Sequence, residues 1–171
     1  GCGEGYYTSG FQAEEKYGFD MSKEALKHAS KNDPSTQYAV ASIFRLPLED
    51  ASCDTAVTCF APFAKDEIER VLTQGGRFFF VSPGPKHLFE LKQLIYDTPY
   101  ENEMKDLETT LVKEEEYFIS NTFHCEKENL ISLFKMTPYY HRTRNEDIDK
   151  INHQDGMDIT AEFLIRVYQK R

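Results

Sequence analysis

An alternation of strand-like and helix-like segments is the feature that most constrains the fold of this chain. The strand-like segments are short, apolar and rich in β-branched or aromatic residues. Four of them lie in the first half: Lys16–Asp20 (KYGFD), Gln37–Ala41 (QYAVA), Asp54–Phe60 (DTAVTCF) and Arg77–Ser82 (RFFFVS). One helical pattern follows an N-cap at Ser22, and we expect glycines 75 and 76 to close another at Lys65–Leu72. This alternation predicts a doubly wound, mostly parallel sheet with right-handed crossovers.

The second half of the chain is less regular. We expect an amphipathic helix, an acidic stretch that is partly loop, a strand, a helix and a last strand: His87–Tyr96, Glu101–Glu116, Tyr117–His124, Lys127–Phe134 and Ala161–Tyr168. The late pair of strands predicts an antiparallel addition at one edge of a Rossmann-like sheet. Asp54–Phe60 is expected at the centre of that sheet, because it is apolar on both faces.

Composition limits the class of protein. The 171 residues suit one α/β domain, residues 1–171. No apolar run approaches the roughly 20 residues that span a bilayer, so no membrane partner is expected. Four cysteines without metal-ligand spacing indicate reduced thiols, a cytoplasmic protein and no metal site in this chain. The net charge of −9 opposes a broad nucleic-acid footprint, so an RNA-directed function needs local basic clusters or a further basic segment.

The chain opens with GCGEG, a glycine turn (Gly1–Gly5) of the kind that lies under a bound ligand. Asp20 ends the next predicted strand, near the roughly 20-residue offset of a ribose-binding carboxylate. Dinucleotide sites use GxGxxG to receive a pyrophosphate, whereas here Glu4 lies in the turn and Tyr6 replaces the third glycine. A carboxylate repels pyrophosphate and attracts an amine. The turn therefore favours S-adenosylmethionine (SAM), which carries an amino group and a sulfonium and no phosphate, over NAD.

Six stretches together resemble the bacterial 23S rRNA guanine-N1 methyltransferases of the RlmA type, which include tylosin-resistance enzymes: GCGEGYYT, YGFDMSKEAL, VASIFRLPLEDASCD, APF, PGPKHLFELKQLIY and MTPYYHR. The first three stretches are generic to class I methyltransferases, whereas PGPKHLFELK and MTPYYHR are much more specific. The resemblance runs nearly end to end. It implies a Rossmann-like class I SAM-dependent methyltransferase fold, with residues 1–96 as the cofactor-binding half and residues 97–171 on the substrate side.

The resemblance also implies segments that the printed sequence does not contain. These are a zinc-binding module associated with RNA recognition, a linker and the first strand, which the family places at the centre of the sheet. We therefore expect a chain truncated at its N-terminus, with zinc bound only in the missing module. The interval from Gly5 to Asp20 is short for a helix and a strand, which leaves open whether residues are missing there too.

Matching positions take their cofactor roles from the resemblance. The expected cofactor contacts are Gly1, Gly3, Glu4, Gly5, Asp20, Met21, Ser42 and His87. The glycine turn touches the methionine end of SAM, Asp20 holds the ribose, and Ser42 lies near the adenine. His87 follows a strand and opens a predicted helix, whose N-terminus disfavours imidazolium, so we expect a neutral ring. The alternative for His87 is a helix-capping residue without a ligand.

The residues that follow the third predicted strand, Phe60 to Phe63, are expected to touch the methyl acceptor. Ala61 lacks the polar group with which enzymes acting on exocyclic amines hold their substrate. Cys59 does not fit the nucleophile of pyrimidine C5 enzymes. A ring nitrogen such as guanine N1 remains compatible. Phe60, Pro62 and Phe63 are expected substrate contacts, and the two phenylalanines either stack on the base or belong to the core.

Transfer to guanine N1 requires alignment with the methyl group and loss of the N1 proton. His87 is the candidate catalytic proton acceptor, and water is the alternative. Tyr139 and Arg142, in MTPYYHR, are expected on the substrate side. Basic side chains near the predicted mouth either hold RNA phosphates or are solvated surface: Lys86, Lys92, His141, Arg142 and Arg144.

The expected function is methylation of guanine N1 in a 23S rRNA hairpin. The resemblance also suggests that the enzyme forms a homodimer. One alternative is a small-molecule methyltransferase of the quinone-biosynthesis kind, which shares the GxGxG, Asp and RLPxxDxxxD pattern. PGPKHLFELK, MTPYYHR and the absence of a hydrophobic lid region argue against it. Another is a non-catalytic SAM-binding or ribosome-associated module. The identity of the guanine and any role in macrolide resistance stay open.

Overall fold

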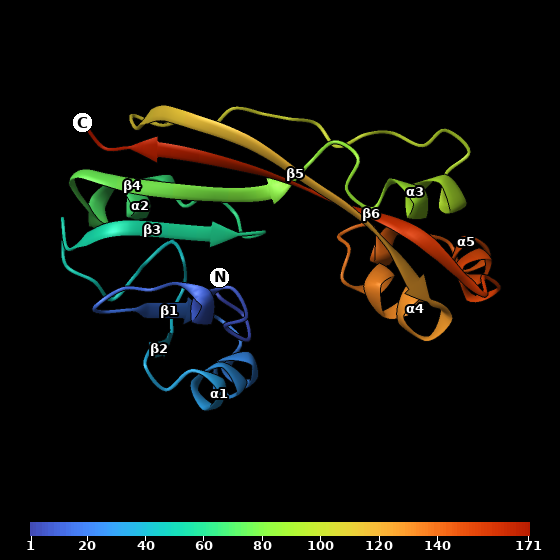
Figure 1. The fold of residues 1–171 in the computed structure, drawn as a ribbon, viewed down its shortest axis with the longest axis horizontal. Coiled ribbons are helices and arrows are strands. Elements are labelled where there is room, and N and C mark those ends of the chain that lie inside the picture. Colours follow the sequence, from blue (N-terminus) through green and yellow to red (C-terminus); the bar gives the residue numbers. More distant parts are fainter. The chain divides into compact units, whose positions relative to one another are not determined.

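The computed structural model describes residues 1–171, which form two compact units (Figure 1). Unit 1 consists of Gly1–Ser82, Asp106–Tyr117 and Ile165–Arg171. Unit 2 consists of Pro83–Lys105 and Phe118–Leu164. The two units are thus interleaved in the sequence. The assignment of residues 1–96 to the cofactor and 97–171 to the substrate stays a prediction.

Helices and strands alternate through the first half of the chain, as the sequence predicts. The helices are α1 (Lys23–Asn32), α2 (Lys65–Val71), α3 (Phe89–Ile95), α4 (Lys127–Lys135) and α5 (Asn145–Asn152), with short 3-10 helices η1 (Thr8–Gly10) and η2 (Tyr140–Arg142). The strands are β1 (Tyr17–Asp20), β2 (Gln37–Val40), β3 (Cys53–Cys59), β4 (Leu72–Pro83), β5 (Val112–Glu126) and β6 (Gly156–Gln169). Even α1, with 10 residues, is too short to cross a bilayer, and none of the helices qualifies as a membrane span.

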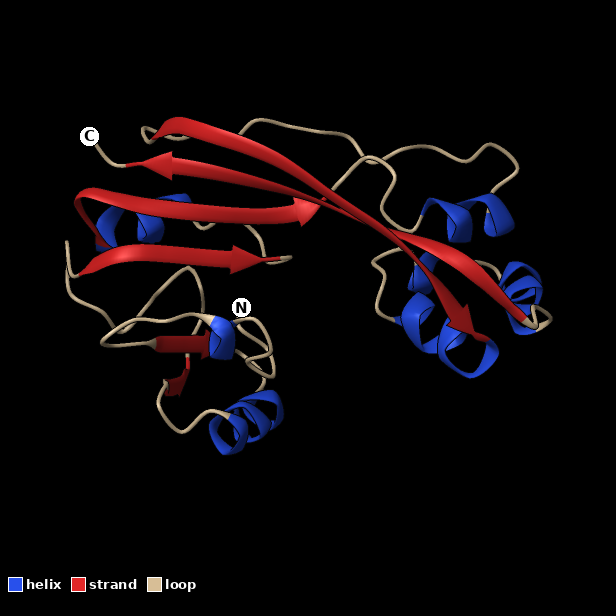
Figure 2. Cartoon of the chain, in the orientation of Figure 1, coloured by secondary structure: helices blue, strands red, loops and turns tan.

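The strands form a two-stranded sheet, β1–β2, and a four-stranded sheet in the order β3–β4–β6–β5. Both β1–β2 and β3–β4 are parallel pairs, and in Figure 2 the arrows of β3 and β4 point the same way. In unit 1, β6 runs against β4: the N–H of Gly75 donates to the carbonyl of Lys170 (2.8 Å), and the N–H of Lys170 donates to that of Gly76 (2.9 Å). A mostly parallel sheet with an antiparallel addition at one edge is therefore confirmed.

Helix α1 begins where the sequence predicts. The Ser22 hydroxyl accepts the N–H of Ala25 at 3.2 Å, so it satisfies one of the donors that the first helical turn leaves unpaired. Leu26 and Ala29, three residues apart, are the buried side chains of the helix. They face β1 and β2, which lie against α1. Local spacing therefore explains both the start of α1 and its packing.

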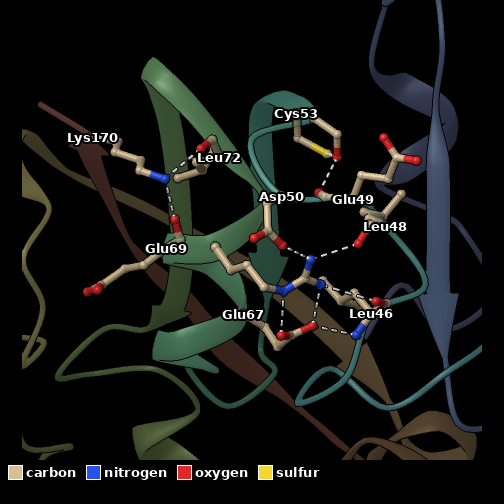
Figure 3. Close-up of polar contacts among 11 residues, drawn as sticks. Leu46, Leu48, Glu49, Asp50, Cys53, Glu67, Glu69, Leu72 and Lys170 are labelled. Carbon is tan, nitrogen blue, oxygen red and sulfur yellow. Dashed lines mark hydrogen bonds and ion pairs between the residues drawn. The ribbon is translucent and has the colours of Figure 1, made fainter.

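The prediction of a glycine cap for α2 is wrong. Helix α2 ends at Val71, and Leu72 is already extended and opens β4, so Gly75 lies within that strand. The last carbonyls of the helix find another donor, because the ammonium of Lys170 donates to the carbonyls of Glu69 (2.6 Å) and Leu72 (2.8 Å), as Figure 3 shows. The ammonium of Lys170, which directly follows β6, thus replaces the glycine cap.

The core of unit 1 lies beside β4. Its buried members are Ile68, Leu72, Phe78, Leu111 and Tyr168. The expected apolar burial of β3 on both faces is wrong, because Thr58 is the one buried residue in that strand. The physical reason is position: β3 is the end strand of its sheet and pairs with β4 alone.

The core of unit 2 is formed by residues from α3, α4, α5 and the strands beside them: Leu88, Leu91, Ile95, Cys125, Leu130, Phe134, Ile151 and Ile159. Helix α5 is not predicted by the sequence, since its segment NEDIDKIN is mostly charged or polar. Ile151 of this helix is nevertheless buried, and α5 packs against α3 and α4.

Helix α3 begins two residues later than predicted. Leu88 adopts a left-handed backbone conformation (φ 54°), so the chain turns there and the helix starts at Phe89. His87 consequently lies in the turn ahead of the helix, where its N–H donates to the carbonyl of Gly84. The expectation that His87 opens the helix is therefore wrong.

Candidate functional site

The glycine turn and Asp20 meet at the carboxyl end of β1. The N–H of Gly3 donates to Oδ2 of Asp20 at 2.8 Å, and the N–H of Ser22 donates to Oδ1 at 2.8 Å. Each carboxylate oxygen keeps a further lone pair after accepting one of these bonds. The carboxylate can therefore accept two more hydrogen bonds, as the two hydroxyls of a ribose require.

Backbone conformation explains the glycines at positions 3 and 5. Both are left-handed, with φ of 54° at Gly3 and 75° at Gly5. A Cβ on Gly5 would lie 2.6 Å from the Tyr38 hydroxyl oxygen and 3.0 Å from the Ala29 Cβ, so the turn packs closely on this side. A Cβ on Gly3 would meet no atom within 4 Å. The open side of the turn at Gly3 is the side that a ligand can approach.

The environment of Asp20 keeps its carboxylate charged. Partial burial works to raise its pKa, but the N–H groups of Ser22 and Gly3 outweigh it, so the pKa lies below its usual value. Beside it, Met21 is exposed, as is Glu4 in the turn. An ionised acceptor, an open backbone turn and an accessible carboxylate suit a ligand that has hydroxyls and an amine. The residues present therefore fit SAM.

Ser42 lies close to this group through the register of the β1–β2 pair. Asp20 is opposite Val40, and the N–H of Ala41 donates to the carbonyl of Asp20 at 3.1 Å. Two residues after β2, the Ser42 hydroxyl accepts the N–H of Phe44 at 3.2 Å and so shapes the loop that follows. The structure brings Ser42 to the same sheet edge as Asp20, as parallel strands require.

Arg70 anchors the far part of that loop, a contact that sequence reasoning missed. Its guanidinium donates to both oxygens of Glu67, to Oδ1 of Asp50 and to the carbonyls of residues 46 and 48. Figure 3 labels these four partners. Glu67 in turn accepts the N–H of Leu46 at 2.6 Å. These bonds from Arg70 and Leu46 lower the pKa of Glu67 to about 2. The loop after β2 is therefore tied to α2 by a fully engaged arginine.

The exit of β3 lies against the glycine turn. A Cβ on Gly1 would stand 2.6 Å from that of Ala61, which places the turn and the segment after β3 in contact. Phe60 is exposed and left-handed (φ 58°), a conformation that is costly for a bulky residue. Phe63 instead stacks on the core residue Phe78, with ring centroids 5.5 Å apart. The contact with Phe78 places Phe63 in the core, whereas the stacking of Phe60 on the base stays a prediction.

His87 belongs to unit 2, where Glu162 engages its ring. The N–H of Glu162 donates to Nδ1 of His87 at 3.2 Å, and the ring packs on Phe163 at 5.3 Å. Burial lowers the pKa of His87, so the ring is neutral, as expected, but burial is the cause instead of a helix N-terminus. A neutral ring that accepts through Nδ1 carries its proton on Nε2. As a base, His87 would first have to release the Glu162 N–H.

Tyr139 and Arg142 also belong to unit 2, where both line one cavity of about 210 Å³. Lys92 lines the same cavity, whereas Arg144 is paired with Asp147 at 3.0 Å. No group of three or more His, Cys, Asp or Glu side chains is arranged to hold a metal ion, and all four cysteines are free thiols.

Known proteins share this arrangement of elements. BH2331 of Bacillus halodurans C-125, provisionally called a methyltransferase, superposes with a TM-score of 0.64 at 16% identity, over 99% of this chain and 89% of that one. YcgJ of Bacillus subtilis superposes with a TM-score of 0.61 at 17% identity, over 100% and 89%. Residues 1–80 match the profile of the methyltransferase domain. The fold is that of a class I SAM-dependent methyltransferase.

The methyltransferase domain implies SAM as the cofactor, and the glycine turn and Asp20 lie within its matched residues. A relative in Bacillus subtilis (strain 168), YxjB, provisionally named a 23S rRNA (guanine-N(1)-)-methyltransferase, is 29% identical over 192 residues, covering 99% of this chain and 65% of that protein. The 23S rRNA (guanine(748)-N(1))-methyltransferase of Streptomyces fradiae is 41% identical over 73 residues, or 42% of this chain and 26% of that protein. This chain therefore spans just under two thirds of the first relative and about a quarter of the second.

Proposed function

We propose that the protein transfers the methyl group of SAM to N1 of a guanine in a hairpin of 23S rRNA. The observation that carries the proposal is the similarity to YxjB over 99% of this chain. The generic methyltransferase match ends at residue 80, whereas this longer match also includes Tyr139 and Arg142, which are expected on the substrate side. Under this proposal the protein acts in the cytoplasm, with ribosomal RNA and a second copy of itself as partners.

The exit of β3 supports a ring nitrogen as acceptor. Ala61 offers no polar side chain to an exocyclic amine. Burial raises the pKa of the Cys59 thiol, which is therefore protonated at neutral pH and a poor nucleophile for attack on a pyrimidine. A ring nitrogen needs neither of these groups. It needs alignment with the sulfonium methyl group, which SAM supplies when bound, and a route for its proton.

In this proposal water takes the N1 proton, because Glu162 already engages the ring of His87. The contact from Glu162 occupies Nδ1 and leaves the ring proton on Nε2.

The test is transfer of labelled methyl from SAM to deproteinised 23S rRNA and to assembled ribosomal subunits. N1-methylguanine blocks Watson–Crick pairing, so reverse transcription should stop at one guanine in treated RNA. An Asp20→Asn variant is the matched control and should give much weaker stops. Label at another atom or on another RNA would overturn the assignment to guanine N1. SAM binding without transfer to any acceptor would indicate a non-catalytic module.

A further inference from the structure

The cavity of about 210 Å³ in unit 2 combines aromatic rings with cations. Its walls include Lys92, Tyr96, Tyr100, Asn102, Tyr139 and Arg142. The ring of Tyr96 lies 5.4 Å from that of Tyr100 and 6.3 Å from that of Tyr139. A second cavity of about 240 Å³ shares Tyr96 and Arg142 with the first. A flat ligand that enters the first cavity would meet tyrosine rings.

Lys92 brings a buried positive charge to this cavity. Only 1% of the residue is exposed, and its ammonium donates to the Tyr100 carbonyl (3.1 Å) and to Oδ1 of Asn102 (2.7 Å). The ammonium also lies 4.4 Å from the centre of the Tyr100 ring. Desolvation is the cause that lowers its pKa, and no carboxylate offsets it. A buried cation held only by neutral acceptors favours a ligand that brings negative charge or lone pairs.

Two further groups point to the same kind of ligand. The guanidinium of exposed Arg142 makes no ion pair, unlike that of Arg144 two residues later, which is bound to Asp147. The hydroxyl of Tyr139 is buried without a hydrogen-bond partner. Burial raises the pKa of Tyr139 to about 12, so the hydroxyl keeps its proton and can donate. A buried donor without an acceptor costs stability unless a ligand supplies one.

We propose that this cavity binds one unpaired nucleotide of the RNA that the protein methylates. The identity of that RNA rests on the proposed function. The base packs against the tyrosine rings and accepts a hydrogen bond from Tyr139, and Arg142 pairs with the phosphate. Aromatic stacking on unpaired bases is the usual way in which proteins recognise RNA loops. The cavity is smaller than the roughly 300–1,000 Å³ of drug-sized sites, so it suits one base. It gives a chain of net charge −9 a local site for RNA.

The experiment measures binding of a fluorescein-labelled 23S rRNA hairpin by anisotropy, without cofactor, so that no methyl transfer occurs. Tyr100→Leu removes an exposed ring, and Arg142→Gln removes the unpaired guanidinium. Each is expected to weaken binding roughly tenfold, in line with the loss of one stacked base or one phosphate contact. The matched controls are Tyr117→Leu and Arg77→Gln, which make the same changes outside the cavity and should bind within about twofold of the wild type.

Tyr139→Phe separates ligand binding from structure. Removal of a buried hydroxyl without a partner should leave the melting temperature unchanged or raise it. RNA binding should nevertheless weaken severalfold, because the base loses its donor. A purely structural hydroxyl would change stability alone and would count against the site.

Wild-type RNA affinity in both Tyr100→Leu and Arg142→Gln would overturn the proposal, as would equal losses in the two controls. Weaker binding of inorganic phosphate in Arg142→Gln, with RNA affinity unchanged, would reduce the cavity to an anion site and also overturn it. The proposed function fails separately. If the wild-type protein binds the hairpin through this cavity but methylates no RNA, the site stands and the guanine-N1 activity does not.

Discussion

Asp20 is the side chain of unit 1 that is expected to hold the ribose of the cofactor. Two backbone N–H groups hold its carboxylate, from Gly3 and Ser22, and neither is a side chain that a substitution could remove. The orientation of the carboxylate is thus fixed by the turn and by the start of α1. A fixed acceptor loses little conformational freedom when a ligand binds.

Asp20→Asn is expected to weaken SAM binding by about 1–3 kcal/mol, because charge-assisted hydrogen bonds to the ribose become neutral ones and one oxygen becomes a donor. Isothermal titration calorimetry with SAM at pH 7 measures the change. Glu24→Gln, on an exposed residue of α1, serves as the control and should bind normally. Equal affinity in Asp20→Asn and the wild type would remove Asp20 from the cofactor site.

Glu67 makes the free energy of unfolding depend on pH in the acidic range. Its pKa falls from an ordinary 4.5 to about 2 through the bonds from Arg70 and Leu46. A carboxylate with a lowered folded-state pKa stabilises the protein above its unfolded pKa and loses this contribution as pH falls toward the folded value. The free energy of unfolding should therefore drop between about pH 4.5 and about pH 2.

Urea titrations at several pH values measure this acid dependence. The Glu67→Gln variant should be less stable than the wild type at pH 7, and the difference should shrink as pH falls below about 4. Other carboxylates contribute to the acid dependence of both proteins, so the difference between them isolates Glu67. A difference that stays constant with pH would contradict the assignment.

The loop after β2 illustrates how one element depends on another. It carries Ser42 at one end, and α2 holds the other end through Arg70. Arg70 uses a planar fork with several donors, which a lysine cannot reproduce. The position of this loop, and with it the expected adenine side of the cofactor site, is therefore a property of α2.

Arg70→Lys should lower the free energy of unfolding measurably and weaken SAM binding severalfold, since the part-buried carbonyls of residues 46 and 48 lose their donor and the loop loosens. Urea denaturation and calorimetry give the two values. Arg45→Lys is the matched control, because it makes the same change at an exposed arginine of the same loop. Full SAM affinity in Arg70→Lys would show that the loop does not contribute to the cofactor site.

The whole chain carries a net charge of −9, so electrostatic attraction to RNA must come from a few positions. The logarithm of RNA affinity should fall with the logarithm of salt concentration with a slope of about −1 to −2, as expected for one or two neutralised phosphates. Anisotropy titrations of the hairpin between about 50 and 200 mM salt measure the slope. A slope steeper than about −5 would indicate a broad basic face that this chain does not show.

Much of the fold could be predicted from neighbouring residues. Ser22 caps α1 as its type and position suggest, and the strands before and after α1 lie where the apolar runs place them. Helix α5 was not predictable in this way, because its charged segment becomes a helix only when Ile151 is buried against α3 and α4. The glycine cap of α2 failed for the same reason, since the donor that closes the helix is Lys170, about 100 residues away.

In the candidate site, too, some features could be predicted from the sequence and others could not. Short-range patterns were enough to indicate the glycine turn, the carboxylate after β1 and the nature of the cofactor, because turn conformation and strand order act within some twenty residues. The engagement of Arg70, the Nε2 tautomer of His87 and the tyrosine-lined cavity around Lys92 depended on the tertiary structure. Each joins residues that are distant in sequence or fixes a direction in space, and strand register and core packing alone determine such contacts.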